Sequence, residues 1–367
     1  MLDGIGRMAR WAVFGLGDEL VRNMFASHKK KDEECVFRRA VVSGATSGVG
    51  EATAKLLAQR GVEVVVGGRN MSKAEEVAKS IRLDGGRATA ALVDLSSCAS
   101  ATRSGRELRR RLGADDRGID LLINNAGSMG ESRSTTLSVN LIATCAFALA
   151  MLPAIDKGVV VNVGSSSHLR APAIGWDTAF LDDEAKDRDL RAYAQSKLCL
   201  LHCSRVFSAA GVNCVDVHPG LVWTTMLRKQ LPGSDFIEKH VPPAWRRRIF
   251  KDPDDAARTL LTAADLGTTQ SPLVPAQRYV VGSKITREHA FGFGGLASAE
   301  SRDPRGIHHT WRNVVGPRLD AAFLDLKEDD DGFKDSITNT KKRLDQACDL
   351  AFPPPPAPSQ PPSASCV

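Results

Sequence analysis

Short apolar segments alternate with longer amphipathic segments through most of the first 285 residues of the 367-residue chain. The apolar segments have the length and the valine content of buried strands, and they lie at 40–44, 62–68, 88–95, 119–127, 157–165, 212–220 and 277–282. Two amphipathic segments between them, 51–61 and 72–86, each end in glycine, as helices commonly do. This alternation predicts an α/β fold, a doubly wound parallel sheet with helices on both faces.

One segment, from Ser134 to Ile155, contains no charged residue. Its length is typical of a membrane-spanning helix. It also contains Asn140, several alanines and, near its end, Pro153. We therefore expect a core helix that is buried against the sheet.

The two ends of the chain differ from its middle. Apolar residues at helical spacing between 13 and 25, followed by three lysines at 29–31, predict either a helix packed on the main domain or an anchor at a membrane interface. The proline-rich end cannot bury enough apolar surface to fold, and its PPPPAP segment suits an SH3- or WW-like domain. The predicted divisions are a helical extension at 1–37, one main domain at 38–326, a charged helix at 327–350 and a disordered tail at 351–367.

The composition, 43% hydrophobic and 25% charged, is that of a globular protein. Aromatic residues make up only 5%, and we interpret the basic clusters at 29–31, 109–111 and 246–248 as solvated faces, so we expect no nucleic-acid partner. The eight cysteines form no CxxC pair and no Cys/His metal spacing. We therefore expect no metal site and a reducing intracellular location, in the cytoplasm or peripherally on a membrane.

The turn after the first predicted strand carries glycines at 44, 48 and 50, in the pattern GxxxGxG. It differs from the commoner dinucleotide pattern GxGxxG and lacks the Lys-Ser/Thr of a P-loop. The physical demand is similar, since a sharp turn, a close backbone approach to a pyrophosphate and a helix N-terminus all favour glycine here. The alternative is a glycine-rich turn that only joins strand to helix.

The second predicted strand ends in Gly67-Gly68-Arg69, where an NAD-binding domain usually places an acidic residue on the ribose 2′-hydroxyl. Arg69 instead offers a guanidinium group that matches a 2′-phosphate. We therefore predict NADP(H) as the cofactor of a Rossmann-type domain.

Tyr193 and Lys197, in the segment YAQSK, are four residues apart and share one face of a helix. A phenol with a pKa near 10 is a poor acid–base catalyst at neutral pH unless a nearby cation stabilises its anion, and Lys197 supplies such a cation. Upstream, VVVNVGSSS ends a strand with hydroxyl groups able to hold a substrate oxygen. YxxxK alone occurs by chance in many helices, but its order after the glycine turn and NNAG is informative.

In these motifs the sequence resembles the short-chain dehydrogenase/reductase family. The matching segments are SGATSGVG (43–50), VDL (93–95), NNAG (124–127), VNVGS (161–165), YAQSK (193–197) and HPGLVWT (218–224), and the resemblance covers about residues 38–285. It implies that Tyr193 is the general acid that protonates a carbonyl oxygen and that Lys197 lowers its pKa and binds the nicotinamide ribose. It implies further that Ser165 binds the substrate oxygen and that Asn140 anchors a proton-relay water. Ser165 is chosen over Ser166 and Ser167 because the family's serine stands third after the Asn of VNVxS.

The same resemblance implies which residues border the cofactor. Residues 44–50 would carry the pyrophosphate, Asp94 and Leu95 the adenine, 125–127 would support the cofactor, and Pro219, Gly220 and Thr224 would lie beside the nicotinamide. The full predicted set is Gly44, Thr46, Ser47, Gly48, Val49, Gly50, Arg69, Asp94, Leu95, Asn125, Ala126, Gly127, Tyr193, Lys197, Pro219, Gly220 and Thr224.

Within the family, the long segment between Ser165 and Tyr193 resembles the branch of retinol dehydrogenases and protochlorophyllide reductases. That branch implies a lipophilic carbonyl or alcohol substrate, such as a retinoid, steroid or lipid aldehyde, and frequent membrane contact, here through the N-terminal segment. Family habit also implies a homodimer. Two departures stand out: Ser43 replaces the usual Thr, and the segment between Gly127 and Asn140 is several residues short, which puts the role of Asn140 in doubt.

Two functions follow, from different classes. The first is an NADP(H)-dependent oxidoreductase that interconverts a carbonyl and an alcohol by hydride transfer. The alternative is a catalytically idle scaffold that binds NADPH and uses its termini for partners, although a scaffold has no need of the intact Ser, Tyr and Lys. A hydrolase built on Ser165 is disfavoured because the sequence has no G-x-S-x-G turn.

Overall fold

A computed structural model gives the fold of most of the chain. The predicted N-terminal extension up to residue 34, the tail from 354 and most of the long segment before Tyr193 lie outside the described residues. The structure describes residues 35–113, 118–155, 157–171, 190–247, 249–268, 279–281, 284–285, 303–324 and 332–353.

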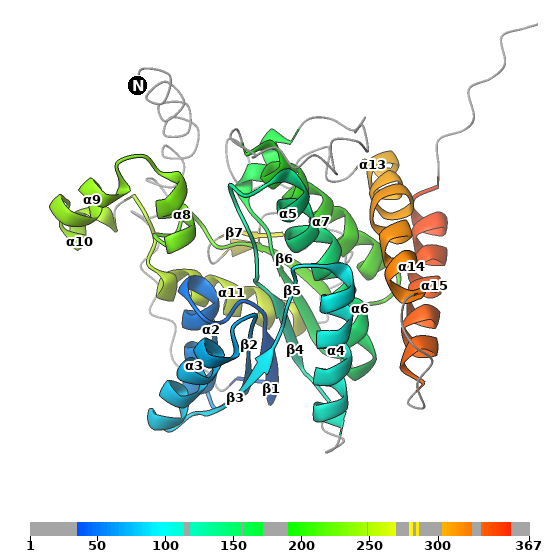
Figure 1. Cartoon of the computed structure of the whole chain (residues 1–367), viewed down its shortest axis with the longest axis horizontal. Coiled ribbons are helices and arrows are strands. Elements are labelled where there is room, and N and C mark those ends of the chain that lie inside the picture. Colours follow the sequence, from blue (N-terminus) through cyan, green and yellow to red (C-terminus); the bar gives the residue numbers. More distant parts are fainter. Residues whose placement is uncertain are drawn as a thin grey trace, which may run out of the picture.

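The described strands form one eight-stranded sheet in the order β3-β2-β1-β4-β5-β6-β7-β8 (Figure 1). Neighbours from β3 to β7 are parallel, and β8 adds an antiparallel edge. The prediction of a doubly wound parallel sheet is confirmed, whereas the two-residue β8 is too short to leave a pattern in the sequence. The strands are β1 (Arg39–Val42), β2 (Glu63–Gly68), β3 (Arg87–Leu92), β4 (Leu121–Asn124), β5 (Val159–Val163), β6 (Cys214–His218), β7 (Tyr279–Val281) and β8 (Lys284–Ile285).

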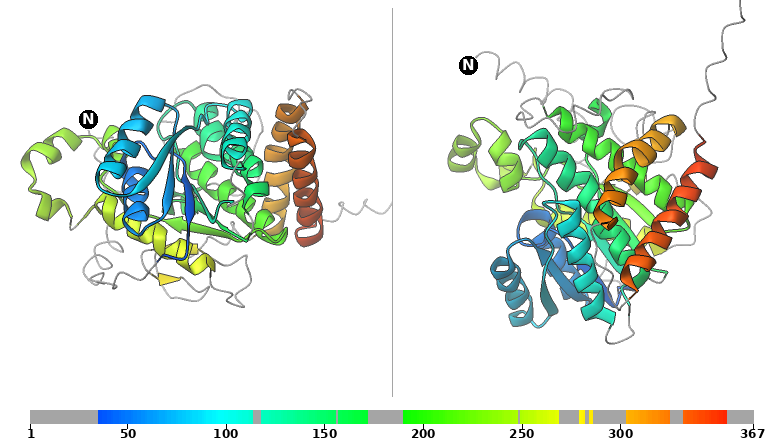
Figure 2. Two further views of the ribbon diagram at one scale, coloured as in Figure 1. Left: turned by 90° about the horizontal axis from the view of Figure 1, so that it is seen from below. Right: turned by 45° about the vertical axis from the view of Figure 1, so that its right-hand side comes forward.

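Helices cover both faces of this sheet, each over its own apolar core (Figures 1 and 2). One face carries α2 (Gly48–Gln59), α3 (Met71–Leu83) and α11 (Pro253–Thr268). The other carries α4 (Cys98–Leu112), α6 (Thr144–Met151) and α7 (Arg191–Ala209). Because the chain leaves β1 toward β3 and then returns to start β4 on its other side, the strand order reverses between β1 and β4, where such sheets bind ligands.

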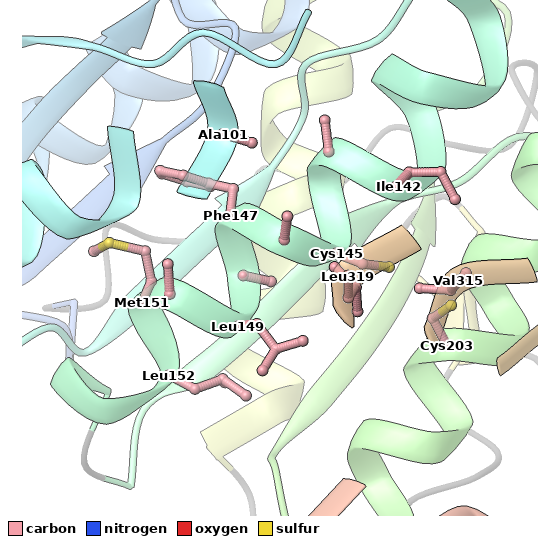
Figure 3. Packing of buried hydrophobic residues seen from close by; sticks show 14 of the residues in the cluster. Ala101, Ile142, Cys145, Phe147, Leu149, Met151, Leu152, Cys203, Val315 and Leu319 are labelled. Carbon is pink, nitrogen blue, oxygen red and sulfur yellow. The ribbon is translucent and has the colours of Figure 1, made fainter. Parts of the chain in front are cut away.

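The uncharged segment forms a continuous helical stretch inside the second core. It consists of α5 (Arg133–Leu137), the π-helix η2 (Ser138–Ala143), α6 and the 3₁₀ turn η3 (Leu152–Ala154). By length and composition alone it qualifies to cross a membrane, but 78% of its most apolar window is buried. Figure 3 shows Phe147, Leu149 and Met151 packed within this cluster. That burial is typical of a core helix.

The C-terminal helices form a further layer outside α4, α6 and α7 (Figure 2). Trp311 is fully buried there, stacks edge-on against Phe207 at 5.9 Å, and donates a hydrogen bond to Asp345 at 2.8 Å. The division of the chain at residue 326 stays a prediction. The elements of this layer are α13 (Pro304–His309), the π-helix η7 (Thr310–Val315), α14 (Gly316–Leu324) and α15 (Phe333–Ala351).

Three short helices project from the body beside the carboxyl end of β6 (Figures 1 and 2). They are α8 (Thr225–Gln230), α9 (Ser234–His240) and α10 (Pro243–Arg246). We call residues 225–250 the lobe.

Candidate active site

The glycine turn between β1 and α2 leaves no room for side chains at two of its glycines. Gly44 has φ +64°, which side chains rarely adopt, and a Cβ there would lie 2.7 Å from the Cα of Ala126. A Cβ at Gly50 would overlap the carbonyl oxygen of Gly44 and the side-chain nitrogen of Asn125. The predicted turn therefore requires glycine for its own geometry.

The N-terminus of α2 offers donors to an anion. Ser47 precedes the helix, but its side chain makes no capping hydrogen bond, so the first-turn N–H groups stay available. The positive end of the helix dipole adds to this preference for negative charge. A pyrophosphate fits this helix end.

Ser43 links the glycine turn to the end of β4. Its buried hydroxyl accepts hydrogen bonds from the backbone N–H groups of Asn125 and Ala126, at 3.1 and 3.2 Å. In return, the Asn125 side chain donates to the carbonyls of Ser43 and Gly44, at 3.0 and 3.1 Å. A hydroxyl at position 43 thus fixes the predicted cofactor residues 125 and 126.

The predicted adenine side of the site lies where β2 and β3 end. The Asp94 carboxylate accepts hydrogen bonds from the backbone and hydroxyl of Ser96, both at 3.0 Å, and Leu95 is buried. A Cβ at Gly68 would overlap the methyl group of Thr46, so the end of β2 lies against the glycine turn. Arg69 follows directly, exposed and without an ion pair among the described residues.

Ser165, Tyr193 and Lys197 meet where β5 ends beside α7. Ser165 caps the 3₁₀ turn η4 (Ser166–Arg170), accepting a hydrogen bond from the Ser167 N–H at 3.2 Å, and its hydroxyl also bonds the Tyr193 hydroxyl. Lys197 Nζ lies 5.8 Å from the centre of the Tyr193 ring and donates to the carbonyl of Val163 at 2.8 Å. The structure therefore brings the three predicted catalytic side chains together.

Burial controls the titration of this group. It raises the pKa of Tyr193, against a smaller lowering by the hydrogen bond to Ser165. It also lowers the pKa of Lys197 to about 8. The predicted lowering of the Tyr193 pKa by Lys197 stays a prediction, and the net direction in the structure, set by burial, is upward. Tyr193 consequently keeps its proton at neutral pH, as a proton donor must.

Asn140 lies next to this group in spite of the short segment before it. A Cβ at Gly127 would lie 3.3 Å from Asn140 Oδ1 and 3.8 Å from Lys197 Nζ. The Asn140 side chain accepts from the Ser128 N–H at 2.7 Å and donates to the Ser128 carbonyl at 2.9 Å and to the Ser196 hydroxyl at 3.0 Å. Its amide therefore holds the short segment in place, from within a π-helix of the kind common at functional sites.

The loop after β6 closes the site from the other side. Pro219 and Gly220 follow the strand, with Gly220 at φ +97°, and Thr224 caps α8. A Cβ at Gly48 would lie 3.2 Å from the Thr224 methyl group, so this loop reaches the glycine turn. Further along α8, the Gln230 side chain donates to the Met129 carbonyl at 3.0 Å, which ties the lobe to the short segment.

A buried polar network that the sequence reasoning missed lies beneath the site. Asn124 donates to Asn162 at 2.8 Å, Asn162 donates to Ser204 at 2.8 Å, and Ser204 donates to Asp216 at 2.6 Å. Burial raises the pKa of Asp216 to about 7. The signal was present, since Asp216 is a carboxyl group in the middle of an otherwise apolar strand segment. Among the described residues, no three His, Cys, Asp or Glu side chains are grouped as metal ligands.

Comparisons with known proteins agree on one family. A family model described as short chain dehydrogenase matches residues 38–176. Polyprenol dehydrogenase of Mus musculus is 34% identical over 249 residues, which cover 62% of this chain and 71% of the relative. Dehydrogenase/reductase SDR family member 13 of Bos taurus is 30% identical over 312 residues, 77% of this chain and 75% of the relative. Human retinol dehydrogenase 13 is 28% identical over 251 residues, 62% and 72% of the two chains.

Solved structures share the fold. A short chain dehydrogenase from Burkholderia cenocepacia in complex with NADP matches with a TM-score of 0.50 and 22% identity, covering 66% of this chain and 95% of its own. The angucycline C-6 ketoreductase LanV with bound NADP matches with a TM-score of 0.51 and 22% identity, covering 67% and 93%. At this level of identity the likeness establishes the architecture alone.

Proposed function

The chain belongs to the short-chain dehydrogenase/reductase family of oxidoreductases, and from this premise we propose that it interconverts a carbonyl and an alcohol on a lipophilic substrate with NADP(H). The observation that carries the proposal is the grouping of Ser165, Tyr193 and Lys197 next to Gly127, in the segment that packs on the glycine turn. An idle scaffold would not need this arrangement.

Several observations support NADP(H) as the cofactor. The uncapped end of α2 and the side-chain-free approach at Gly44 and Gly50 suit a pyrophosphate. The exposed guanidinium of Arg69, at the end of β2, suits a ribose 2′-phosphate. When bound, the cofactor supplies the hydride.

The roles of the side chains follow from their positions. Tyr193 holds the proton that the substrate oxygen receives, and Ser165 orients that oxygen through its hydroxyl. Lys197 is buried behind Tyr193 and provides the nearby positive charge. Asn140 positions the segment that begins at Ser128, beside Lys197.

The names of the relatives support a lipophilic substrate. Relatives named for polyprenol and retinol both act, by those names, on long apolar alcohols. We therefore propose an isoprenoid, retinoid or steroid alcohol, or the corresponding carbonyl compound, as the substrate class of this chain.

Tyr193→Phe tests the proposal directly. We expect oxidation of NADPH with a panel of retinoid, steroid and aliphatic aldehydes to fall by about 100-fold or more, because the proton donor is lost while the ring still packs. NADPH binding, followed by fluorescence titration, should stay as in the wild type. Turnover equal to the wild type would contradict the role of Tyr193. NADPH binding without turnover by either protein on any substrate would favour the scaffold.

Arg69→Ala tests the choice of cofactor. We expect the dissociation constant of NADPH to rise about tenfold or more and that of NADH to change little, since only NADPH has the phosphate that Arg69 would bind. Competitive titration of both cofactors measures the difference. Equal effects on NADPH and NADH would exclude recognition of the 2′-phosphate by Arg69.

A further inference from the structure

The inner face of the lobe packs on Trp223, in the loop that joins the lobe to β6. The Trp223 ring packs against Phe250 at 4.7 Å and lies under the guanidinium of Arg246 at 5.4 Å. Glu238 accepts a hydrogen bond from the Trp223 indole at 2.5 Å and pairs with Arg246 at 2.7 Å. Contacts from α9 and α10 therefore converge on Trp223 in the β6–α8 loop.

The outer face of the lobe carries large apolar side chains that are exposed to solvent. Phe236 stands two residues before Glu238, and therefore on the opposite side of α9, where it is 65% exposed and stacks on His240. Trp245, next to the inward-facing Arg246, is 63% exposed, and Met226 on α8 is 37% exposed. Three large apolar side chains are therefore exposed on one projection of the molecule.

The lobe is also strongly basic. Residues 225–250 hold six Lys or Arg and two Asp or Glu, a net charge of +4, in a chain whose net charge is +6. Lys229 and Lys239 are exposed and have no ion pair among the described residues. Lys229 on α8 and Lys239 on α9 therefore place exposed positive charge on the same projection as the Phe236 and Trp245 side chains.

We propose that the outer face of the lobe docks on an anionic lipid bilayer. Tryptophan and phenylalanine prefer the boundary between headgroups and acyl chains, and lysine and arginine are attracted to anionic headgroups. The strength of such docking grows with the apolar area inserted and with the attraction to anionic lipids, and the lobe offers both kinds of side chain. A stable protein interface, by contrast, buries about 800 Å² on each partner, which calls for a broader apolar patch than these separate side chains provide.

If the substrate is lipophilic, as the proposed function has it, the position of the lobe lets docking deliver the substrate to the site. Thr224, at the start of α8, reaches the glycine turn, and Gln230, at its end, bonds the segment that leads to Asn140. A bilayer under the lobe would therefore lie beside the mouth of the site, where a lipophilic substrate could enter without crossing water. The docking itself is measurable without any turnover.

Vesicle co-sedimentation of the full-length protein tests the docking. Vesicles of phosphatidylcholine with phosphatidylserine should bind the wild type more tightly than phosphatidylcholine alone, and salt should weaken this binding. We expect Phe236→Ala with Trp245→Ala, and separately Lys229→Gln with Lys239→Gln, to weaken it by about tenfold each. The matched controls are Leu83→Ala with Leu350→Ala and Lys79→Gln with Lys342→Gln, which change exposed residues on α3 and α15 and should bind as the wild type does.

Lobe variants that bind like the wild type, with NADPH binding intact, would overturn the proposal and leave an acidic protein as the remaining partner for this face. A wild type that does not bind anionic vesicles would overturn it as well. Quenching by acyl-brominated lipid adds a direct signature: Trp245→Phe should keep vesicle binding but lose part of the quenched tryptophan emission. Unchanged quenching in Trp245→Phe would show that this ring does not enter the bilayer.

Discussion

The glycine turn and the lobe both border the carboxyl ends of the strands, and they are built in opposite ways. In the turn, backbone meets backbone so closely that a single added carbon at Gly50 would overlap its neighbours. In the lobe, large side chains such as Phe236 and Trp245 point into solvent, and only the inner face is packed. The comparison shows that close packing, which excludes side chains, determines the shape of the glycine turn, whereas exposed large side chains characterise the outer face of the lobe.

Gly50→Ala should have the largest effect, because it disrupts the tightly packed glycine turn. The new methyl group would push the Gly44 carbonyl and the Asn125 side chain apart, and we expect a loss of about 3 kcal/mol or more in unfolding free energy, together with loss of NADPH binding. Urea unfolding and cofactor titration measure both. Gly113→Ala is the matched control, since Gly113 ends α4 at φ −73° with open space around its Cα. Equal stability of the two variants would show that the turn is less crowded than the structure indicates.

The same contrast explains what could be predicted from the sequence. The strands, the glycine turn, Tyr193 and Lys197 leave local patterns, because each depends on neighbours within a few residues or on a backbone that only glycine tolerates. Their roles could be assigned through the family resemblance, and the fold and family are confirmed. The cofactor and catalytic roles of individual residues stay predictions.

Contacts between distant segments could not be predicted in this way. Ser43 bonds residues more than 80 positions away, and Asn140 is held by Ser196, 56 positions away, so neither contact leaves a local pattern. The exposed rings of the lobe also leave no local pattern, because the exposure of Phe236 and Trp245 depends on how α9 and α10 pack on Trp223.

Asp216 lies in β6, the strand that leads into the lobe, and should produce an intermediate, pH-dependent effect. Its pKa is raised to about 7 in the folded protein, above its ordinary value of 3.8. The folded state therefore keeps the proton longer than the unfolded state does. Its contribution to stability is complete below about pH 4 and is lost as pH rises to about 7, a change of the order of a few kcal/mol.

Asp216→Asn should remove this dependence, since the amide oxygen can still accept from Ser204 and carries no charge. We expect the variant to gain in unfolding free energy over the wild type as pH rises from 5 to 8, as measured by urea unfolding at both values. Asp235→Asn, at an exposed position on α9, should show no such trend. A difference between wild type and Asp216→Asn that is independent of pH would contradict the raised pKa.

Gln230→Ala should have the smallest effect on stability, and it tests the lobe in the same way that Gly50→Ala tests the glycine turn. It removes one hydrogen bond, to the Met129 carbonyl, and should cost about 1 kcal/mol or less in unfolding free energy. Because that bond ties α8 to the segment before Asn140, we expect KM for a lipophilic aldehyde to rise severalfold while kcat and the dissociation constant of NADPH stay unchanged. Gln59→Ala, on the exposed side of α2, is the matched control and should change none of these values. Gln230→Ala could instead weaken NADPH binding as much as substrate binding. That result would show that the lobe and the glycine turn do not act separately on substrate and cofactor.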